Sequence, residues 1–178
     1  MNLGLNGDEV KVVPYTEEWS TEFLKVKKEI HEHTQISENR IEHIGSTAIK
    51  NMMAKPILDI LVAVDDLLKV DNSIIEGLKA IGFLRLKVER PNEIVFAKFT
   101  DNTYRVKTHF IHLVEFEKEL WKNIIFFRDY LNDNENARNE YMELKLNYLK
   151  KHSTGIHAYT EYKEDFVKVI LKKMFSNK

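Results

Sequence analysis

The pattern of apolar positions predicts helices in the first half of the chain. Trp19, Phe23, Val26 and Ile30 are spaced by four, three and four residues, and this repeat places them on one face of an α-helix. A second stretch has an acidic start, apolar residues at helical spacing and a glycine near its end, which are typical of a complete helix. The predicted helices cover residues 16–33, where Thr16 is the expected N-cap, and residues 65–83.

Shorter runs predict the strands of a sheet. One of them is apolar on both faces except for a single acid, as expected of a central strand that is covered on both sides. The others alternate polar and apolar residues or are bounded by turn residues. The predicted strands cover residues 40–45, 55–64, 84–89, 93–100 and 104–116, and a short helical turn is expected at 46–54.

The chain becomes wholly helical after residue 116. Apolar stripes predict helices over residues 117–133, 135–153 and 160–175, with a loop at 154–159. The basic residues within 145–152 and 167–173 are interpreted as solvated helix faces, because too few aromatic residues alternate with them to form a nucleic-acid surface.

These elements predict one α+β domain over residues 1–178. Residues 1–116 are expected to form an α/β core, with a mixed sheet and flanking helices, and residues 117–178 a helical tail. The chain is long enough to bury a core of its own, and no repeat or low-complexity linker divides it.

The amino-acid composition restricts the possible functions of the chain more than it restricts the fold. The 178 residues include 27 basic and 28 acidic side chains, so the formal net charge is −1 and no overall field attracts nucleic acid. The absence of cysteine excludes disulfides, thiolate catalysis and cysteine-based zinc sites. No apolar run approaches the ~20 residues of a membrane span, and the start lacks a signal pattern, so we expect a cytoplasmic protein without a membrane partner.

A Gly-Ser pair lies where the strand at 40–45 gives way to the helical turn. Glycine lets the backbone approach a ligand closely, and free amide groups at a helix start favour phosphate. The hydroxyl groups of Ser46 and Thr47 are at the same place. The pattern therefore indicates a phosphate-binding loop formed by Gly45, Ser46 and Thr47, although these residues also suit a simple helix cap.

Asp59 is the single acid of the apolar run 55–64. Alternation along a strand places Lys55, Ile57, Asp59 and Leu61 on one face, so the carboxylate is expected to face the Gly-Ser turn. A carboxylate beside phosphate is repulsive unless a cation lies between them, and Mg²⁺ held by a carboxylate and phosphate oxygens is the usual arrangement. The alternative is a structural salt bridge with Lys55 or an arginine.

The longer stretch HIGSTAIKNMMAKPILDI, residues 43–60, resembles the core motif of the GrpB family. The resemblance extends over nearly the whole chain, through VVPYTEEWSTEF and THFIHLVEF to FFRDYL and YMELK. Gly45 and Ser46 followed by Asp59 are similar to the signature of the nucleotidyltransferase superfamily, which has the DNA polymerase beta-like fold. The resemblance implies a nucleotidyltransferase-like mixed sheet with flanking helices, followed by a helical C-terminal extension, and a nucleoside triphosphate as ligand.

Two departures from the family pattern bear on this expectation. Typical members have serine, proline and glycine where this chain has Ala48, Lys50 and Asn51. Asparagine is the next-best residue to glycine at a left-handed turn, so the turn is expected to survive. Classical nucleotidyltransferases also carry a second acid two residues after the first, where this chain has Leu61. One ligand of the usual metal pair is therefore missing.

His112 is the residue that the resemblance favours as a replacement for that acid. On a regular strand His109 and His112 point to opposite faces, so only one of them can face Asp59. His112 would ligate a metal together with Asp59 or act as a general base on an acceptor hydroxyl, and Glu115 is a further candidate base. The alternative is a core histidine that is hydrogen-bonded to the backbone.

Two cations complete the predicted site. Lys55 shares the face of Asp59 and would bind phosphate as a point charge, or form a plain salt bridge. Arg128 follows an apolar stripe in the tail and would reach phosphate through its bidentate guanidinium, or pair with Asp129 or Glu135.

Three functions are compatible with this pattern. The first is an enzyme that binds a nucleoside triphosphate and Mg²⁺ and transfers a nucleotidyl group to a small acceptor, with Asp59 and His112 as its catalytic and metal-ligating residues. The second is a non-catalytic nucleotide- or coenzyme-binding module with a degenerate active site, which Leu61 favours. The third, a scaffold whose tail binds a partner, leaves the Gly-Ser/Asp59 pairing unexplained. The nucleotide-binding residues of the first two are Gly45, Ser46, Thr47, Lys55 and Arg128.

Overall fold

A mixed sheet forms the centre of the computed structural model, which describes residues 3–6, 8–88, 90–100, 102–152 and 154–176. Its six strands are β1 (Leu5–Asn6), β2 (Ile41–Ile44), β3 (Leu58–Val64), β4 (Phe83–Arg85), β5 (Ile94–Phe99) and β6 (Val106–Glu115). The order across the sheet is β2-β3-β6-β5-β4, and β1 pairs with β6. β3 runs parallel to β6 and the other pairings are antiparallel, so the sheet is mixed, as predicted.

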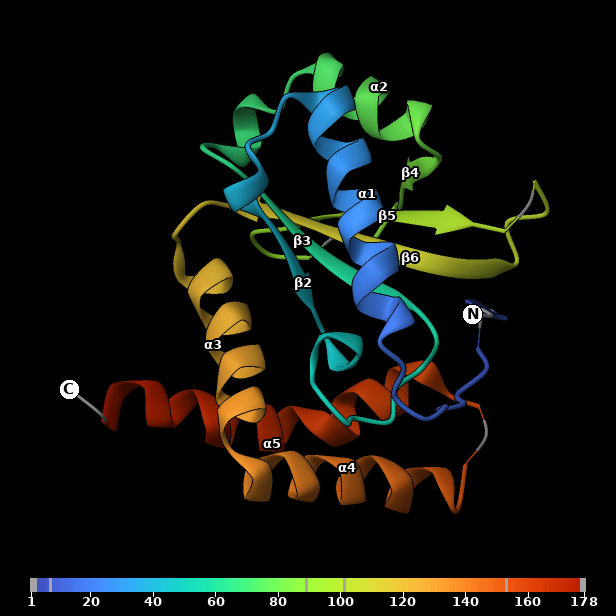
Figure 1. The fold of residues 1–178 in the computed structure, drawn as a ribbon, viewed down its shortest axis with the longest axis vertical. Helices are drawn as coiled ribbons and strands as arrows, with labels where there is room; N and C mark the ends of the chain where they lie inside the picture. Colours follow the sequence, from blue (N-terminus) through green and yellow to red (C-terminus); the bar gives the residue numbers. More distant parts are fainter. Residues whose placement is uncertain (1–2, 7, 89, 101, 153, 177–178) are drawn as a thin grey trace.

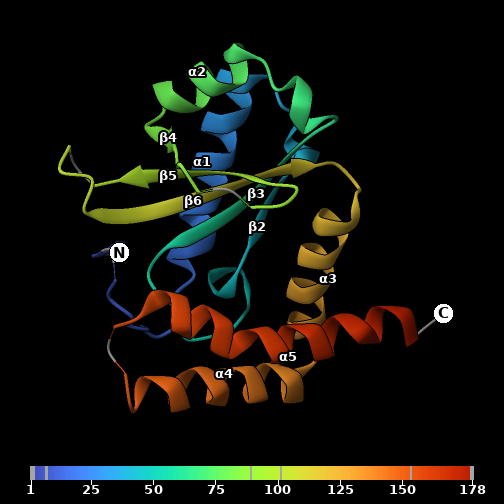
Figure 2. The ribbon, with the colours of Figure 1, turned by 180° about the vertical axis from the view of Figure 1, so that it is seen from behind.

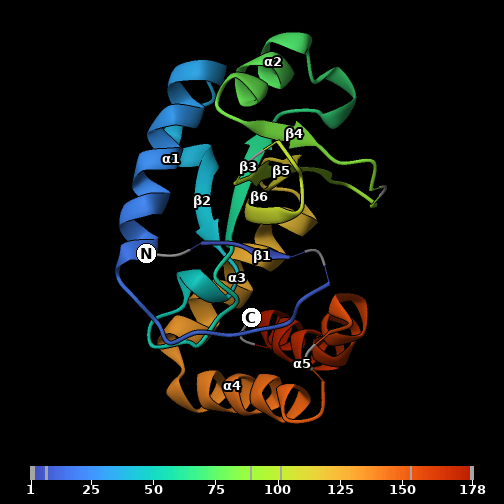
Figure 3. The same ribbon diagram turned by 90° about the vertical axis from the view of Figure 1, so that its right-hand side faces the viewer.

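Helices pack against one face of this sheet, beside it and at one end of it (Figures 1 and 2). They are α1 (Glu18–Thr34), α2 (Asn72–Ala80), α3 (Glu119–Asp133), α4 (Glu135–Leu149) and α5 (Ile156–Ser176). The side view in Figure 3 shows α1 along one face, while α4 and α5 lie together below the lower end of β2. In the part of the chain that the structure describes, no helix is both long and apolar enough to cross a membrane.

Alternation along β3 divides the core into two layers. Ile60 and Val62 are fully buried and pack with the apolar stripe of α1. Leu61 is fully buried on the opposite face, where it packs with Trp121 of α3. Burying each such aliphatic side chain contributes about 1.5–3 kcal/mol. Because both faces are apolar and covered, the register of β3 is fixed, and so is the direction of Asp59 next to them.

The boundaries of the predicted elements are set by local hydrogen bonds. The helix predicted over 65–83 is shorter, because the Asp71 carboxylate accepts hydrogen bonds from amides two and three residues ahead and starts α2 at Asn72. The chain before it forms a separate 3₁₀ turn at Leu67–Lys69. The turn predicted at 46–54 is likewise reduced to one 3₁₀ turn.

Other boundaries also differ from the prediction, and two of them concern β4 and α5. β4 ends at Arg85 rather than at residue 89. α5 begins at Ile156, four residues earlier than predicted, because the amide of Tyr159 already donates a hydrogen bond to the carbonyl of Gly155 at 3.0 Å. The predictions made for residues 89 and 153 lie outside the described residues.

Candidate functional site

The Gly-Ser turn and Asp59 lie against each other, as the sequence predicts. β2 pairs with β3 so that Ile44 is opposite Asp59, and the chain leaves β2 through Gly45. This glycine has φ 69° and ψ −170°, a conformation that side chains disfavour, and a Cβ added to it would overlap the Asp59 carboxylate. Only glycine therefore allows the backbone to pass this close to the acid. The 3₁₀ turn Ser46–Ala48 follows immediately.

Asp59 remains accessible although its neighbours are buried, since 34% of its side chain is exposed. Desolvation alone would raise the pKa of Asp59, but the interaction with His112 and the charges of Lys55 and Lys163 outweigh it and hold the pKa below its ordinary value. The carboxylate is therefore ionised at neutral pH and faces positive groups.

His112 is held between two carboxylates. On β6, His112 is paired with Leu61 of β3, so it shares the face of Asp59, as the family resemblance implies. Its Nε2 lies 3.7 Å from Asp59 Oδ1, and its Nδ1 lies 2.9 Å from Glu93 Oε2. Glu93 in turn pairs with Arg90 at 3.0 Å. We call Asp59, His112, Glu93 and Arg90 the charge chain.

The charge chain fixes the protonation of His112. Burial alone would lower the pKa of its imidazole, but Asp59 and Glu93 together raise it to about 9. The ring is therefore an imidazolium at neutral pH and donates from both nitrogens. His112 can ligate a metal or act as a general base only as the neutral ring. Both roles remain predictions, and each requires that the imidazolium first loses a proton.

Three lysines, which we call the lysine cluster, gather beside the Gly-Ser turn: Lys55, Lys145 and Lys163. The ammonium group of Lys145, from α4, donates hydrogen bonds to Ser46 Oγ at 3.3 Å and to the backbone carbonyl of Met53. It also lies 5.0 Å from the centre of the Tyr141 ring. The side chain of Lys145 is almost completely enclosed, with 2% of the residue exposed.

One aromatic ring holds the other two lysines together. The ammonium groups of Lys163 and Lys55 lie 4.3 Å and 5.6 Å from the centre of the Tyr159 ring. Burial and the neighbouring ammonium groups lower the pKa of Lys145 to about 7, and burial and Lys55 lower the pKa of Lys163 to about 8. Among the described residues, none of the three forms a direct ion pair with a carboxylate. The lysine cluster is thus a concentration of basic groups that no carboxylate of the described residues contacts directly, although the charge of Asp59 acts on Lys55 and Lys163.

Two of the predicted nucleotide-binding residues are engaged elsewhere. The hydroxyl of Thr47 lies 2.9 Å from His43 Nε2, and 2% of the residue is exposed. The guanidinium of Arg128 binds Glu42 at 2.6 Å and Asp129 at 2.7 Å, so the ion pair with Asp129 that the sequence left open is present. Gly45, Ser46, Lys55, Asp59 and His112 lie together, whereas Thr47 and Arg128 are tied to other protein groups.

Sequence reasoning missed the contribution of Lys145 and Lys163 to this site. The interpretation of the basic residues within 145–152 as a solvated face was wrong for Lys145, which is buried. A signal was present: the buried positions of α4 are Ala137, Tyr141, Lys145 and Tyr148, which puts a lysine in the middle of an apolar stripe. Glu93 was missed as well, because its contact with His112 depends on the pairing of β5 with β6.

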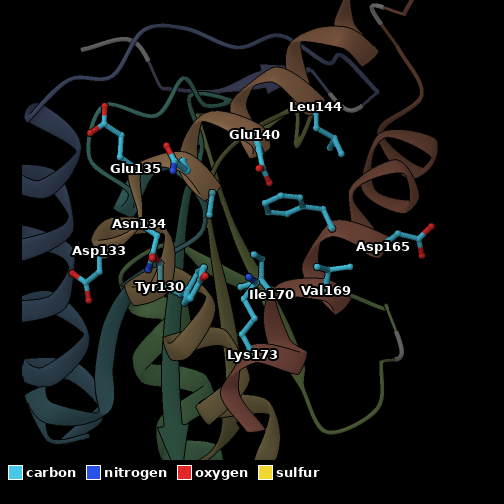
Figure 4. Close-up of a pocket in the computed structure, with 13 residues that line it drawn as sticks. Tyr130, Asp133, Asn134, Glu135, Glu140, Leu144, Asp165, Val169, Ile170 and Lys173 are labelled. Atoms are coloured by element: carbon cyan, nitrogen blue, oxygen red, sulfur yellow. The ribbon is translucent and has the colours of Figure 1, made fainter. Parts of the chain in front are cut away.

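A separate hollow of about 830 Å³ opens between α3, α4 and α5. Its floor is apolar and includes Leu144 and Ile170, and Figure 4 shows the carboxylates of Asp133, Glu135 and Asp165 pointing away from one another. In the described ranges no group of three histidines or acids is arranged to hold a metal. The hollow contains none of the charge chain and none of the lysine cluster.

Comparisons with known proteins show the family of this chain. The family model described as GrpB protein matches residues 9–173. Glutamate-rich protein GrpB of Alkalihalophilus pseudofirmus is 42% identical over 173 residues, which are 97% of this chain and 99% of that protein. The UPF0157 protein YqkA of Bacillus subtilis is 30% identical over 159 residues, 89% of this chain and 45% of that protein.

Solved structures of similar fold include a GrpB protein and a nucleotidyltransferase. The crystal structure of conserved protein GrpB from Enterococcus faecalis has a TM-score of 0.78 at 27% identity and covers 94% of this chain and 98% of that one. A cytoplasmic RNA terminal U-transferase has a TM-score of 0.50 at 14% identity, over 75% of this chain and 40% of that one. The second likeness concerns the fold alone, which is nucleotidyltransferase-like.

Proposed function

Since this chain belongs to the GrpB family and has a nucleotidyltransferase-like fold, we propose that it binds a nucleoside triphosphate, or another phosphate-bearing small molecule, beside Gly45 and Asp59. The observation that carries the proposal is the meeting of the glycine turn, an ionised acid and the lysine cluster at one place. Phosphate groups favour ammonium donors and close backbone approach. The ligand would lie against Ser46, with Lys55 beside it.

Asp59 is the group that would hold Mg²⁺ in this proposal. Mg²⁺ prefers oxygen donors and usually keeps several waters or phosphate oxygens beside one or two carboxylates. A single ionised and partly exposed carboxylate suits one such ion, whereas a pair of ions would need the second acid that Leu61 replaces. The ion would supply charge neutralisation between Asp59 and the ligand.

Nucleotidyl transfer to a small acceptor is the reaction that we propose for a catalytic form of the site. An acceptor oxygen or nitrogen would form a bond to the α-phosphorus while the bond to pyrophosphate breaks. Positive charge from the lysine cluster would stabilise the departing pyrophosphate. His112 would accept the acceptor's proton only after losing its own, because its pKa is raised to about 9.

A binding module without turnover is the second candidate, and the burial of Leu61 favours it. Leu61 is fully enclosed between Ile44 and Trp121, so the missing acid has been replaced by a packed apolar side chain and its position offers no ligand to a metal. Such a protein would bind nucleotide or coenzyme with the same residues and release it unchanged.

Calorimetric titration with ATP, GTP, CTP and UTP, with and without Mg²⁺, tests the proposal. We expect binding of at least one nucleotide, with a Mg²⁺-dependent component that Asp59→Asn removes. Asp133→Asn, on the exposed end of α3, is the matched control and should leave binding unchanged. Failure of all four nucleotides to bind under either condition would contradict the nucleotide proposal. Release of pyrophosphate in the presence of candidate acceptors separates the enzyme from the binding module.

A further inference from the structure

We infer that the lysine cluster binds a chain of two or more phosphate groups directly, without a divalent cation between these three ammonium groups and the phosphate oxygens. The inference rests on the phosphate site of the proposed function and specifies how that site recognises its ligand. It assigns the phosphate chain to Lys55, Lys145 and Lys163, two of which come from the helical tail.

The first argument is the state of Lys145. An ammonium group has three donors, and Lys145 uses two of them, on Ser46 Oγ and on the Met53 carbonyl. In the described part of the chain, the third donor has no acceptor. A buried charge is costly unless an opposite charge accompanies it. A phosphate oxygen next to Ser46 would supply both the missing acceptor and the missing negative charge.

The second argument is that the three lysines lie close together from distant parts of the chain. Lys55 precedes β3, Lys145 lies in α4 and Lys163 in α5. Lys55 and Lys163 are both within 5.6 Å of the centre of one tyrosine ring. Like charges repel each other, and the charges of neighbouring lysines act on Lys145 and Lys163, so the protein without ligand maintains an arrangement that an extended anion would stabilise. One phosphate group is too small to serve three ammonium groups, whereas a chain of phosphates presents an oxygen to each.

The third argument is that Asp59 is already paired. In the charge chain, Asp59 and Glu93 lie within 3.7 Å of the basic side chains of His112 and Arg90. The three lysines are then in excess, and the region is positive without any metal. Where two acids line a phosphate site, cations are needed to neutralise them. With Leu61 in place of one acid and lysines facing the other, direct contact with phosphate is the electrostatically favoured arrangement.

Titration of the full chain with inorganic tripolyphosphate, pyrophosphate and orthophosphate in EDTA at pH 6.5 tests this inference. We expect tripolyphosphate to bind most tightly and orthophosphate least. Lys145→Met should weaken tripolyphosphate binding at least tenfold, because it removes one charged donor. Lys150→Met, at the exposed end of the same helix, is the matched control and should leave the affinity unchanged.

Asp59→Asn gives the sharpest result, because the two ways of holding phosphate predict opposite signs. Under direct binding, loss of the carboxylate removes a negative charge that faces the lysines, so tripolyphosphate should bind severalfold more tightly in EDTA. If Mg²⁺ is the bridge, the wild type binds no tripolyphosphate in EDTA and Asp59→Asn abolishes the binding that Mg²⁺ restores. That outcome would overturn the inference.

A second lysine variant and the nucleotide titrations complete this test. If Lys145→Met does not fold, as judged by circular dichroism, Lys163→Gln carries the same expectation. An affinity equal to that of the wild type in a folded variant of either lysine overturns the inference. If tripolyphosphate binds in EDTA and no nucleotide binds, the inference is supported and the nucleotide proposal is contradicted. If a nucleotide binds only with Mg²⁺ and tripolyphosphate does not bind in EDTA, the nucleotide proposal is supported and the inference is overturned.

Discussion

The sheet and the helical tail both bring ionisable groups to the candidate site, but they compensate those charges differently. On the sheet, His112 lies between Asp59 and Glu93, and an arginine completes the series, so every charge has an opposite neighbour. In the tail, Lys145 and Lys163 contact a hydroxyl, a carbonyl and aromatic rings, and neither forms a direct ion pair with a carboxylate of the described residues. The charges on the sheet side are compensated by other side chains without a ligand, whereas the charges on the tail side are not.

The difference separates stability from binding. Paired charges on the sheet stabilise the fold, since removing one member leaves another buried without its partner. Unpaired charges in the tail cost stability and are available to a ligand. Substitutions on the two sides should therefore change the free energy of unfolding in opposite directions.

Glu93→Ala should give the largest loss of stability. The Glu93 side chain is 8% exposed, and its removal leaves Arg90 and half of the His112 ring unpaired. Breaking a buried ion pair costs about 3–5 kcal/mol, and we expect about 3 kcal/mol here from urea unfolding at pH 7. Glu76→Ala, which breaks an exposed pair with Lys79 on α2, is the control and should cost less than about 1 kcal/mol. Equal costs for the two variants would contradict the buried pairing.

The charge on His112 predicts a pH dependence. Its pKa is raised from 6.5 to about 9 in the folded protein, so its contribution is fully present below the unfolded value and is lost as pH rises through about 9. The size of the shift corresponds to about 3 kcal/mol. The lowered pKa values of Lys145 and Lys163 make the free energy of unfolding rise with pH, which opposes the contribution of His112. An NMR titration of the His112 ring therefore measures its pKa directly. A titration midpoint near pH 6.5 would contradict the raised pKa of His112 and therefore its charged contact with Asp59 and Glu93.

Gly45→Ala sharpens the comparison at the point where the two sides meet. The new methyl group would overlap Asp59, and φ 69° is unfavourable for alanine, so we expect a loss of about 2 kcal/mol. Gly82→Ala is the matched control, because it has positive φ with only ordinary contacts to the Lys98 side chain. Thermal unfolding of both variants measures the part of the loss that comes from the close approach to Asp59.

The sequence predicted the sheet side of this comparison well and the tail side poorly. Periodicity located the helices and strands. Alternation predicted that only one of His109 and His112 faces Asp59, and the family resemblance favoured His112. The partner of His112 escaped prediction because Glu93 reaches it only through the pairing of β5 with β6. Lys145 escaped because lysine is assigned to solvent by default, although its position on an apolar stripe marked it as buried.

Lys145→Met should have the opposite sign to Glu93→Ala. Methionine has a similar length and no charge, so the variant loses the cost of enclosing an ammonium group that has no counter-ion. We expect it to be more stable than the wild type by about 2 kcal/mol at pH 6. The pKa of Lys145 is lowered to about 7 in the folded protein, so the ammonium is charged there at pH 6 and increasingly neutral at pH 9. The gain should therefore shrink between these two values.

The pH dependence of that gain distinguishes charge from packing. If methionine stabilised α4 only by filling space with apolar atoms, the difference from the wild type would be the same at pH 6 and pH 9. Lys150→Met, whose parent side chain is exposed near the end of α4, should show almost no difference at either pH. Urea unfolding of the three proteins at both pH values gives the comparison. A variant that is more stable yet binds tripolyphosphate less well would show that this lysine is retained for its ligand, at the expense of the fold.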